Sequence, residues 1–230
     1  MEKGDVFERF SFLEEKGHII SFVGAGGKTT WMYRMAEYYS ARGYRVLVTT
    51  TTHIWIPEGN GWVKSLEEAE NKWNKGEYVV VGEEAPNGKL SSVERKKLQS
   101  YMKKAEVVLV EADGAKRMPC KVPADHEPVL LPESDIVVGI MGMDSLGKSL
   151  KEICFRVDDA ESLLGKLREE ILTEEDMIEI LSSDRGTRKN VGSRHYCVIL
   201  NKCNDKQRKQ AAKRIAERLR EKGILEVAIG

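Results

Sequence analysis

The chain of 230 residues carries 37 lysines and arginines against 37 aspartates and glutamates. This balance excludes an overall electrostatic field that would draw the protein to nucleic acid or to an anionic membrane. The length fits one domain with a substantial hydrophobic core, so we predict a single domain over residues 1–230.

The first predicted elements form a strand, a loop, a helix and a second strand. A short amphipathic helix is predicted over residues 6–17, and the apolar run 18–24 is the first strand. Apolar side chains then recur at helical spacing over residues 29–42, and the β-branched run 45–51 is the second strand. This order is typical of a βαβ unit, in which the two strands are parallel and the crossover is right-handed.

Strands and helices alternate along the rest of the chain. Further strands are predicted at 78–82, 106–112, 135–142, 196–201 and 225–230. Further helices are predicted at 65–75, 92–104, 158–170, 173–182 and 205–222, and a loop is expected at 54–64. Several strands are almost wholly apolar, as strands covered by helices on both faces are. We therefore predict an α/β fold, a P-loop NTPase-like three-layer sandwich with a mostly parallel sheet and a small helical insertion around residues 150–190.

The four cysteines form no C-x-x-C pair and lack the density of a disulfide framework, which is typical of a reducing compartment. The first residues contain no apolar signal-peptide core, and no later segment approaches about 18 uninterrupted apolar residues. We therefore expect a soluble, cytoplasmic protein without a membrane or nucleic-acid partner.

The stretch GAGGKTT, residues 24–30, lies between the first strand and the first helix. Its glycines let the backbone approach a phosphate, and the N–H groups that begin the helix point toward that phosphate. Lys28 can reach the terminal phosphates, and the hydroxyl of Thr29 can bind Mg²⁺. The loop is shorter than the pattern G-x-x-x-x-G-K-[ST], because Phe22 stands where that pattern has its first glycine. We predict that the loop binds ATP or GTP with Mg²⁺.

Polar side chains follow two of the predicted strands. Glu111 and Asp113 come at the end of the strand VVLVEADG, where a carboxylate can meet nucleotide-bound Mg²⁺, and we expect both on one side of that strand. Thr51 and Thr52 follow the second strand, on the same edge of the sheet as the glycine loop. The sequence therefore predicts that these strand ends converge on one site.

Two later segments add candidate residues. In GAKRMPCKVPADHEP, residues 114–128, cations can meet a phosphate, and Asp125 and His126 can serve proton transfer. In VILNKCND, residues 198–205, Asn-Lys resembles the guanine-reading N-K-x-D turn. The aspartate comes one position late, however, at Asp205, where it can instead cap the next helix.

These segments define the candidate site. The predicted catalytic residues are Lys28, Glu111, Asp113, Asp125 and His126. The predicted nucleotide-binding residues are Gly24, Ala25, Gly26, Gly27, Lys28, Thr29, Thr30, Thr51, Thr52, Lys116, Arg117, Asn201 and Lys202. The predicted Mg²⁺ ligands are Thr29, Glu111 and Asp113.

The segments VGAGGKTT, LVTTTTHIWIP, LVEADGAKRMPCKVPADHEP, VVGIMGMDSLG and VILNK together resemble the YqeC-type family, over roughly residues 15–205. Members of that family are described as accessory proteins of selenium-dependent molybdenum hydroxylases and of selenium cofactor biosynthesis. The resemblance implies a role in maturing or inserting the selenium-containing molybdenum cofactor, with the hydroxylase or its cofactor as partner. Three activities stay open: an NTPase or NTP-dependent enzyme, a nucleotide-switched chaperone with little turnover, and a small-molecule kinase.

Overall fold

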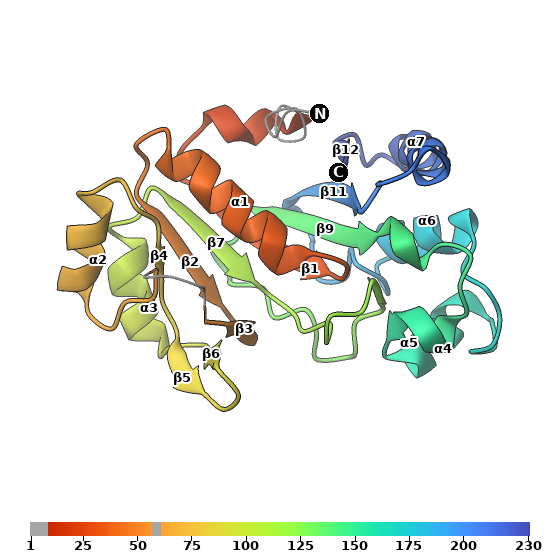
Figure 1. Cartoon of the computed structure of the whole chain (residues 1–230), viewed down its shortest axis with the longest axis horizontal. Coiled ribbons are helices and arrows are strands. Elements are labelled where there is room, and N and C mark those ends of the chain that lie inside the picture. Colours follow the sequence, from red (N-terminus) through yellow and green to blue (C-terminus); the bar gives the residue numbers. More distant parts are fainter. Residues whose placement is uncertain (1–8, 57–60) are drawn as a thin grey trace.

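A computed structural model describes residues 9–56 and 61–230. Its central sheet contains β1 (Ile19–Gly24), β2 (Val46–Thr50), β4 (Val79–Val80), β7 (Val107–Glu111), β9 (Ile136–Gly142), β11 (His195–Asn201) and β12 (Val227–Ile229). The strand order is β12-β11-β9-β1-β7-β2-β4, and every adjacent pair is parallel (Figure 1). The prediction of an α/β fold with a mostly parallel sheet is confirmed.

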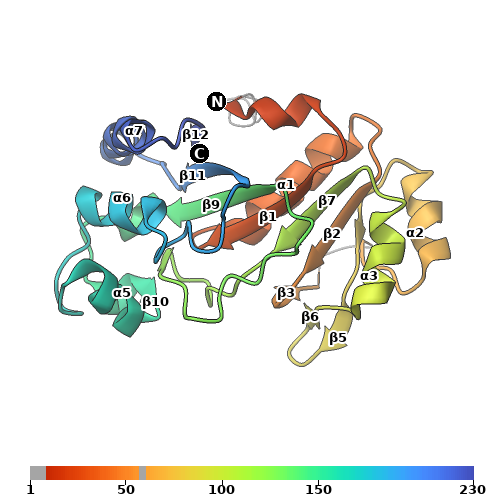
Figure 2. The same cartoon turned by 180° about the vertical axis from the view of Figure 1, so that it is seen from behind.

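Helices cover both faces of this sheet (Figures 1 and 2). They include α1 (Lys28–Ser40), α2 (Leu66–Trp73), α3 (Arg95–Met102), α6 (Glu174–Ser182) and α7 (Lys206–Glu221). One core cluster joins one face of the sheet to α1 and to Phe10, Phe12 and Leu13 of the N-terminal segment. Two further clusters join the other face to α2 and α3 at the β2–β4 edge, and to α6 and α7 beneath β9 and β11. The result is a three-layer sandwich.

Local signals set the ends of several helices. Asp205 caps α7, because its Oδ1 accepts a hydrogen bond from the backbone N–H of Arg208 at 2.8 Å. The capping role given as the alternative for Asp205 is therefore confirmed. α5 (Val157–Leu164) ends at Gly165, which has a left-handed φ of 65°. The helix predicted over 158–170 is correspondingly shorter than expected.

The structure also differs from the prediction in its smallest elements. The described part of the predicted helix 6–17 contains the 3-10 turn Ser11–Glu14 in place of an α-helix, and residues 6–8 lie outside the described residues. The predicted loop 54–64 overlaps β3 (His53–Trp55), and its residues 57–60 also lie outside the described residues. Strands this short carry no periodic signal that a sequence could show.

Two small sheets lie beside the main one. One is antiparallel and contains β3, β5 (Glu83–Ala85) and β6 (Lys89–Ser91). In the other, β8 (Cys120–Lys121) pairs in parallel with β10 (Cys154–Phe155). This second pairing brings the loop after β7 next to a segment that is distant in sequence.

The stretch between β9 and β11, where the insertion is predicted, contains α4 (Leu150–Ile153), α5 and α6. The single domain predicted over 1–230 includes stretches outside the described residues and stays a prediction. All four cysteines are free and buried. Within the described ranges, no helix combines the length and apolar character needed to cross a membrane.

The strand order places the glycine loop at the point in the sheet from which strands are added in opposite directions. β7, β2 and β4 lie on one side of β1, whereas β9, β11 and β12 lie on the other. In open α/β sheets, ligands bind outside the carboxyl ends of the strands at such a point. The loop that follows β1 stands at this position.

A buried hydrogen bond ties β11 to α6 and offers a test of this packing. The hydroxyl of Tyr196 donates to the carbonyl oxygen of Leu181 at 2.9 Å. We expect Tyr196→Phe to lower the free energy of unfolding by about 1 kcal/mol, measured by urea denaturation, because the carbonyl loses its partner. Tyr33→Phe is the control, since that buried hydroxyl has no hydrogen-bond partner among the described residues. Equal losses in the two variants would contradict the assignment.

Candidate functional site

The glycine loop, residues 24–30, is packed against the ends of β9 and β11. Gly26 and Gly27 have φ values of 81° and 133°. A Cβ at Gly26 would lie 2.3 Å from the backbone nitrogen of Gly142, and one at Gly27 would lie 2.2 Å from Nδ2 of Asn201. Both the backbone conformation and the lack of space therefore require glycine here, with or without a ligand.

Lys28 begins α1 and is held beneath the loop by a carboxylate. Only 5 % of the residue is exposed. Its Nζ donates to the carbonyl oxygen of Gly24 at 2.7 Å and lies 3.0 Å from Oδ1 of Asp113, whose other oxygen accepts the N–H of Gly24 at 2.9 Å. Burial acts to lower the pKa of Lys28, but the charges of Asp113 and Glu111 outweigh it and raise that pKa. The lysine is therefore charged and ion-paired in this structure.

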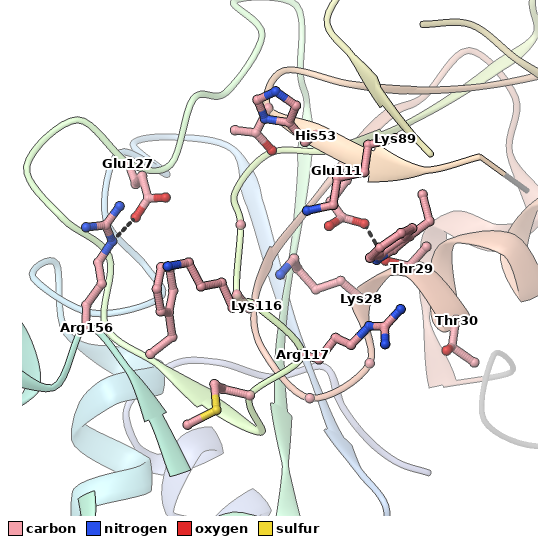
Figure 3. A pocket seen from close by; sticks show the side chains of 18 of the residues that line it. Lys28, Thr29, Thr30, His53, Lys89, Glu111, Lys116, Arg117, Glu127 and Arg156 are labelled. Atoms are coloured by element: carbon pink, nitrogen blue, oxygen red, sulfur yellow. Dashed lines mark hydrogen bonds and ion pairs between the residues drawn. The ribbon is translucent and has the colours of Figure 1, made fainter. Parts of the chain in front are cut away.

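Thr29 and Glu111 form the second contact between the loop and β7. The hydroxyl of Thr29 donates to Oε2 of Glu111 at 2.6 Å (Figure 3). Burial raises the pKa of Glu111, although Lys28 and the Thr29 hydroxyl act against it. A hydroxyl beside a carboxylate supplies the oxygen ligands that Mg²⁺ takes together with phosphates and water. The described ranges contain no group of three or more His, Cys, Asp or Glu side chains placed to hold a metal ion.

A chain of opposite charges leads away from the loop. Asp113, which pairs with Lys28, also lies 3.3 Å from Nζ of Lys121. Lys121 has a fully buried side chain and lies 2.9 Å from Oε2 of Glu127, which in turn lies 2.8 Å from Nε of Arg156. Burial acts to raise the pKa of Glu127, but Lys121 and Arg156 lower it below its ordinary value. Each carboxylate of the chain is thus shared between two cations.

The glycine loop and the charged residues line an open cavity of about 1080 Å³, slightly above the ~300–1,000 Å³ of small-molecule sites. Its described lining contains two carboxylates, Glu111 and Glu127. The cations of that lining are Lys28, Lys89, Lys116, Arg117, Arg156 and Lys202. This surplus of positive charge suits an anionic ligand.

Most of the predicted site residues meet at this cavity. Those that line it are Gly26, Gly27, Lys28, Thr29, Thr30, Thr52, Glu111, Lys116, Arg117, His126 and Lys202. Gly24 and Ala25 are buried at the base of the loop, and Asp113 lies beneath the cavity, 2 % exposed. Because β7 ends at Glu111, Asp113 turns toward Lys28 while Glu111 reaches the cavity.

Besides Gly24, Ala25 and Asp113, three further predicted residues lie outside the cavity lining. The hydroxyl of Thr51 donates to the carbonyl oxygen of Val129 at 2.7 Å, and the side chain of Asp125 is fully exposed. The side-chain amide of Asn201 donates to the carbonyl oxygen of Gly26 at 2.6 Å, so this residue supports the loop from behind. The roles predicted for these residues stay predictions.

The structure adds lining residues that the sequence analysis missed. Trp55 and Lys89 come from the small antiparallel sheet, and Phe155 and Arg156 come from β10 and the residue after it. Phe155 and Arg156 reach the cavity because β10 pairs with β8, a contact between two-residue strands. No periodicity in the sequence indicates such a pairing.

The fold and the cavity define an α/β protein with a glycine loop and a cation-lined site at the reversal point of a parallel sheet. A family model described as YqeC protein matches residues 20–158. The chain is also 30% identical over 186 residues to a protein called "Uncharacterized protein YqeC" of Escherichia coli (strain K12), covering 77% of this chain and 73% of that protein. The chain therefore belongs to the YqeC family, which confirms the resemblance seen in its motifs.

The shared position of Asp113 between two buried lysines leads to a prediction about stability. Asp113→Asn removes the charge that Lys28 and Lys121 both contact. We expect the free energy of unfolding to fall by about 3–5 kcal/mol, measured by denaturant titration, because breaking a buried pair leaves uncompensated charge. Glu169→Gln is the control, since its 3.8 Å pair with Lys151 is exposed and should contribute little. A variant as stable as the parent protein would contradict the buried charge chain.

Proposed function

We propose that this protein binds ATP or GTP with Mg²⁺ in the cytoplasm and acts as an NTP hydrolase or NTP-dependent transferase. One observation carries the proposal: the glycine loop begins α1 at Lys28 and sets the Thr29–Glu111 pair at the wall of a cation-lined cavity. The first N–H groups of a helix are unsatisfied donors that favour a phosphate. Phosphate oxygens and Mg²⁺ would thus meet partners that the fold holds close together.

The order of the loop residues gives the nucleotide a direction. In loops of this type the lysine reaches the β- and γ-phosphates, the following hydroxyl binds Mg²⁺, and the backbone amides hold the α- and β-phosphates. Lys28 would accordingly meet the terminal phosphate, and Thr30 would lie toward the α-phosphate. Lys28 would then divide its contacts between Asp113 and the nucleotide. Asp113 would keep its ion pair with Lys121, so its buried charge would not lose all compensation.

The chemistry would be phosphoryl transfer by positioning and charge neutralisation. In hydrolysis, a water oxygen bonds to the γ-phosphorus while the bond to the β-phosphate oxygen breaks, giving the diphosphate and inorganic phosphate. Lys28 and Mg²⁺ held by Thr29 and Glu111 would balance the charge on the terminal phosphate oxygens. His126 lines the cavity and is the candidate for moving the proton.

The family resemblance supports a place for this activity in maturing or inserting the selenium-containing molybdenum cofactor of a hydroxylase. Multiple-turnover release of phosphate, measured with and without such a hydroxylase, separates an NTPase from a nucleotide-switched chaperone. Phosphate that appears on a product instead of in solution would identify a small-molecule kinase.

Removing the loop lysine tests nucleotide binding directly. We expect Lys28→Ala to lose about 1.5–3 kcal/mol of binding free energy for ATP or GTP with Mg²⁺, roughly ten- to a hundredfold, because a charged hydrogen bond disappears. Isothermal titration calorimetry measures this loss, with thermal denaturation as the check on folding. Lys103→Ala, at an exposed lysine outside the cavity, should bind as the parent protein does. Unchanged affinity of Lys28→Ala for both nucleotides would overturn the proposal.

The raised pKa of Glu111 predicts a pH dependence of Mg²⁺ binding. A proton competes with the metal for this carboxylate, so Mg²⁺-dependent nucleotide affinity should fall as the pH decreases toward the pKa of Glu111. That pKa lies above the ordinary 4.5 of a glutamate. By the same shift, the ligand-free folded protein binds this proton more tightly than the unfolded chain, so Glu111 adds stability as the pH falls.

Calorimetric titrations at several pH values between about 8 and about 5 measure the metal dependence. In Glu111→Gln the titrating group is absent, and we expect the metal-dependent part of the affinity to be lost together with its pH dependence. Parallel pH profiles in the two proteins would show that the metal does not use this carboxylate.

A further inference from the structure

The cavity has two ends, and a cluster of cations and an aromatic ring stands at each. Lys116 and Arg117 are consecutive residues, but their side chains diverge. The guanidinium of Arg117 lies 4.6 Å from the ring of Trp55, whereas Nζ of Lys116 lies 5.1 Å from the ring of Phe155. Figure 3 shows the two side chains pointing to opposite sides of Lys28. We call these regions the Trp55 end and the Phe155 end.

The backbone holds the cations of both ends in an unfavourable conformation. φ is 45° at Lys116, 64° at Arg117 and 66° at Arg156. Residues other than glycine rarely adopt such positive values. Six described non-glycine residues have positive φ, and Asn190 alone among them lies outside the cavity lining. Conformations of this kind persist where the surrounding structure imposes them, and they concentrate at functional sites.

The charges at the Phe155 end are incompletely balanced. Glu127 is shared by Lys121 and Arg156, at 2.9 and 2.8 Å. No carboxylate among the described residues pairs with Lys116, and the ring of Phe155 lies 5.0 Å from the guanidinium of Arg156. Lys121 has a second carboxylate partner in Asp113, whereas Arg156 depends on the shared Glu127 and the charge of Lys116 is unpaired among the described residues. An anion placed between Lys116 and Arg156 would complete the balance.

A bound nucleotide would leave this end unoccupied. This step rests on the proposed function, because the order of Lys28 and Thr30 sets the direction of the phosphates. Arg117 points toward the side of Thr30, so the Trp55 end would receive the ribose and base (Figure 3). The Phe155 end then lies beyond the terminal phosphate. The volume of about 1080 Å³ leaves room for a second small molecule there.

We propose that the Phe155 end binds a second ligand, a small molecule bearing a phosphate or carboxylate group, while a nucleotide occupies the glycine loop. Arg156 supplies a planar fork of donors that matches either group, and Lys116 adds a point charge from the opposite wall. Such a ligand faces the terminal phosphate and is the second substrate of the proposed enzyme.

The test is a titration of anions into protein saturated with Mg²⁺ and a non-hydrolysable ATP or GTP analogue. Inorganic pyrophosphate probes the phosphate class and citrate probes the carboxylate class. We expect calorimetry to show saturable binding of at least one of them, and the anion that binds identifies the class. Arg156→Gln should weaken this binding about tenfold or more, because charged hydrogen bonds are lost, with nucleotide affinity retained.

Lys116→Gln keeps the test independent of folding effects at Arg156, since Lys116 has no carboxylate partner among the described residues, and it should also weaken anion binding. Lys103→Gln is the matched control and should bind as the parent does. Absence of saturable binding for both anions, or equal binding in the parent, Arg156→Gln and Lys116→Gln, would overturn the second site.

Nucleotide binding is measured separately from anion binding, so that failure of the proposed function and failure of the second site can be distinguished. If no nucleotide binds, the proposed function fails, and the anions are titrated into ligand-free protein. Anion binding that Arg156→Gln weakens and Lys28→Ala leaves intact would then still support the Phe155 site. Anion binding lost only in Lys28→Ala would place the anion at the glycine loop and overturn the second site.

Discussion

The ion pair between Lys28 and Asp113 is the interaction on which the arrangement of the site depends. Both side chains are almost completely buried, and each charge would cost several kcal/mol of desolvation without a partner. The pair fixes the glycine loop against the segment after β7. Asp113 also contacts Lys121, which pairs with Glu127, and Glu127 pairs with Arg156. Each buried charge in this series therefore requires the next one. Charge compensation thereby constrains the loop over 113–127 and the segment that pairs with it through β8 and β10.

The same electrostatics make the two carboxylates at the end of β7 differ. Asp113 already has cations on both sides, whereas burial dominates at Glu111 and raises its pKa. A group whose ionised form is disfavoured by burial gains most from a nearby cation. Glu111 is therefore the carboxylate that a metal ion would stabilise, and Asp113 is the one that positions Lys28. Two acids only two residues apart thus have different electrostatic surroundings, because β7 ends at Glu111.

The sequence predicted those features of the fold and site that depend on local pattern. The βαβ unit, the parallel sheet, the glycine loop and the cap at Asp205 all follow from periodicity or from turn and capping chemistry. The position of β1 between β7 and β9 is a tertiary property. For the same reason, the motif Asn201–Lys202 was recognised, but its contact with the back of the loop was not, since that contact requires β11 to end beside Gly26.

Positive φ values occur at glycines of the loop and at cationic residues of the Phe155 end, and the reasons differ between the two. At Gly26 and Gly27 there is no space for a Cβ, so packing alone accounts for glycine. At Lys116 and Arg156, glycine would relieve a conformational cost of about 1 kcal/mol each, and yet long cationic side chains occupy these positions and enter the cavity. The ion pair with Glu127 gives Arg156 a structural reason to be a cation, whereas Lys116 has no carboxylate partner among the described residues and brings its charge to the cavity. At the Phe155 end, residues with an unfavourable backbone conformation thus place cations at the cavity. In the glycine loop, by contrast, positive φ occurs at residues without a side chain.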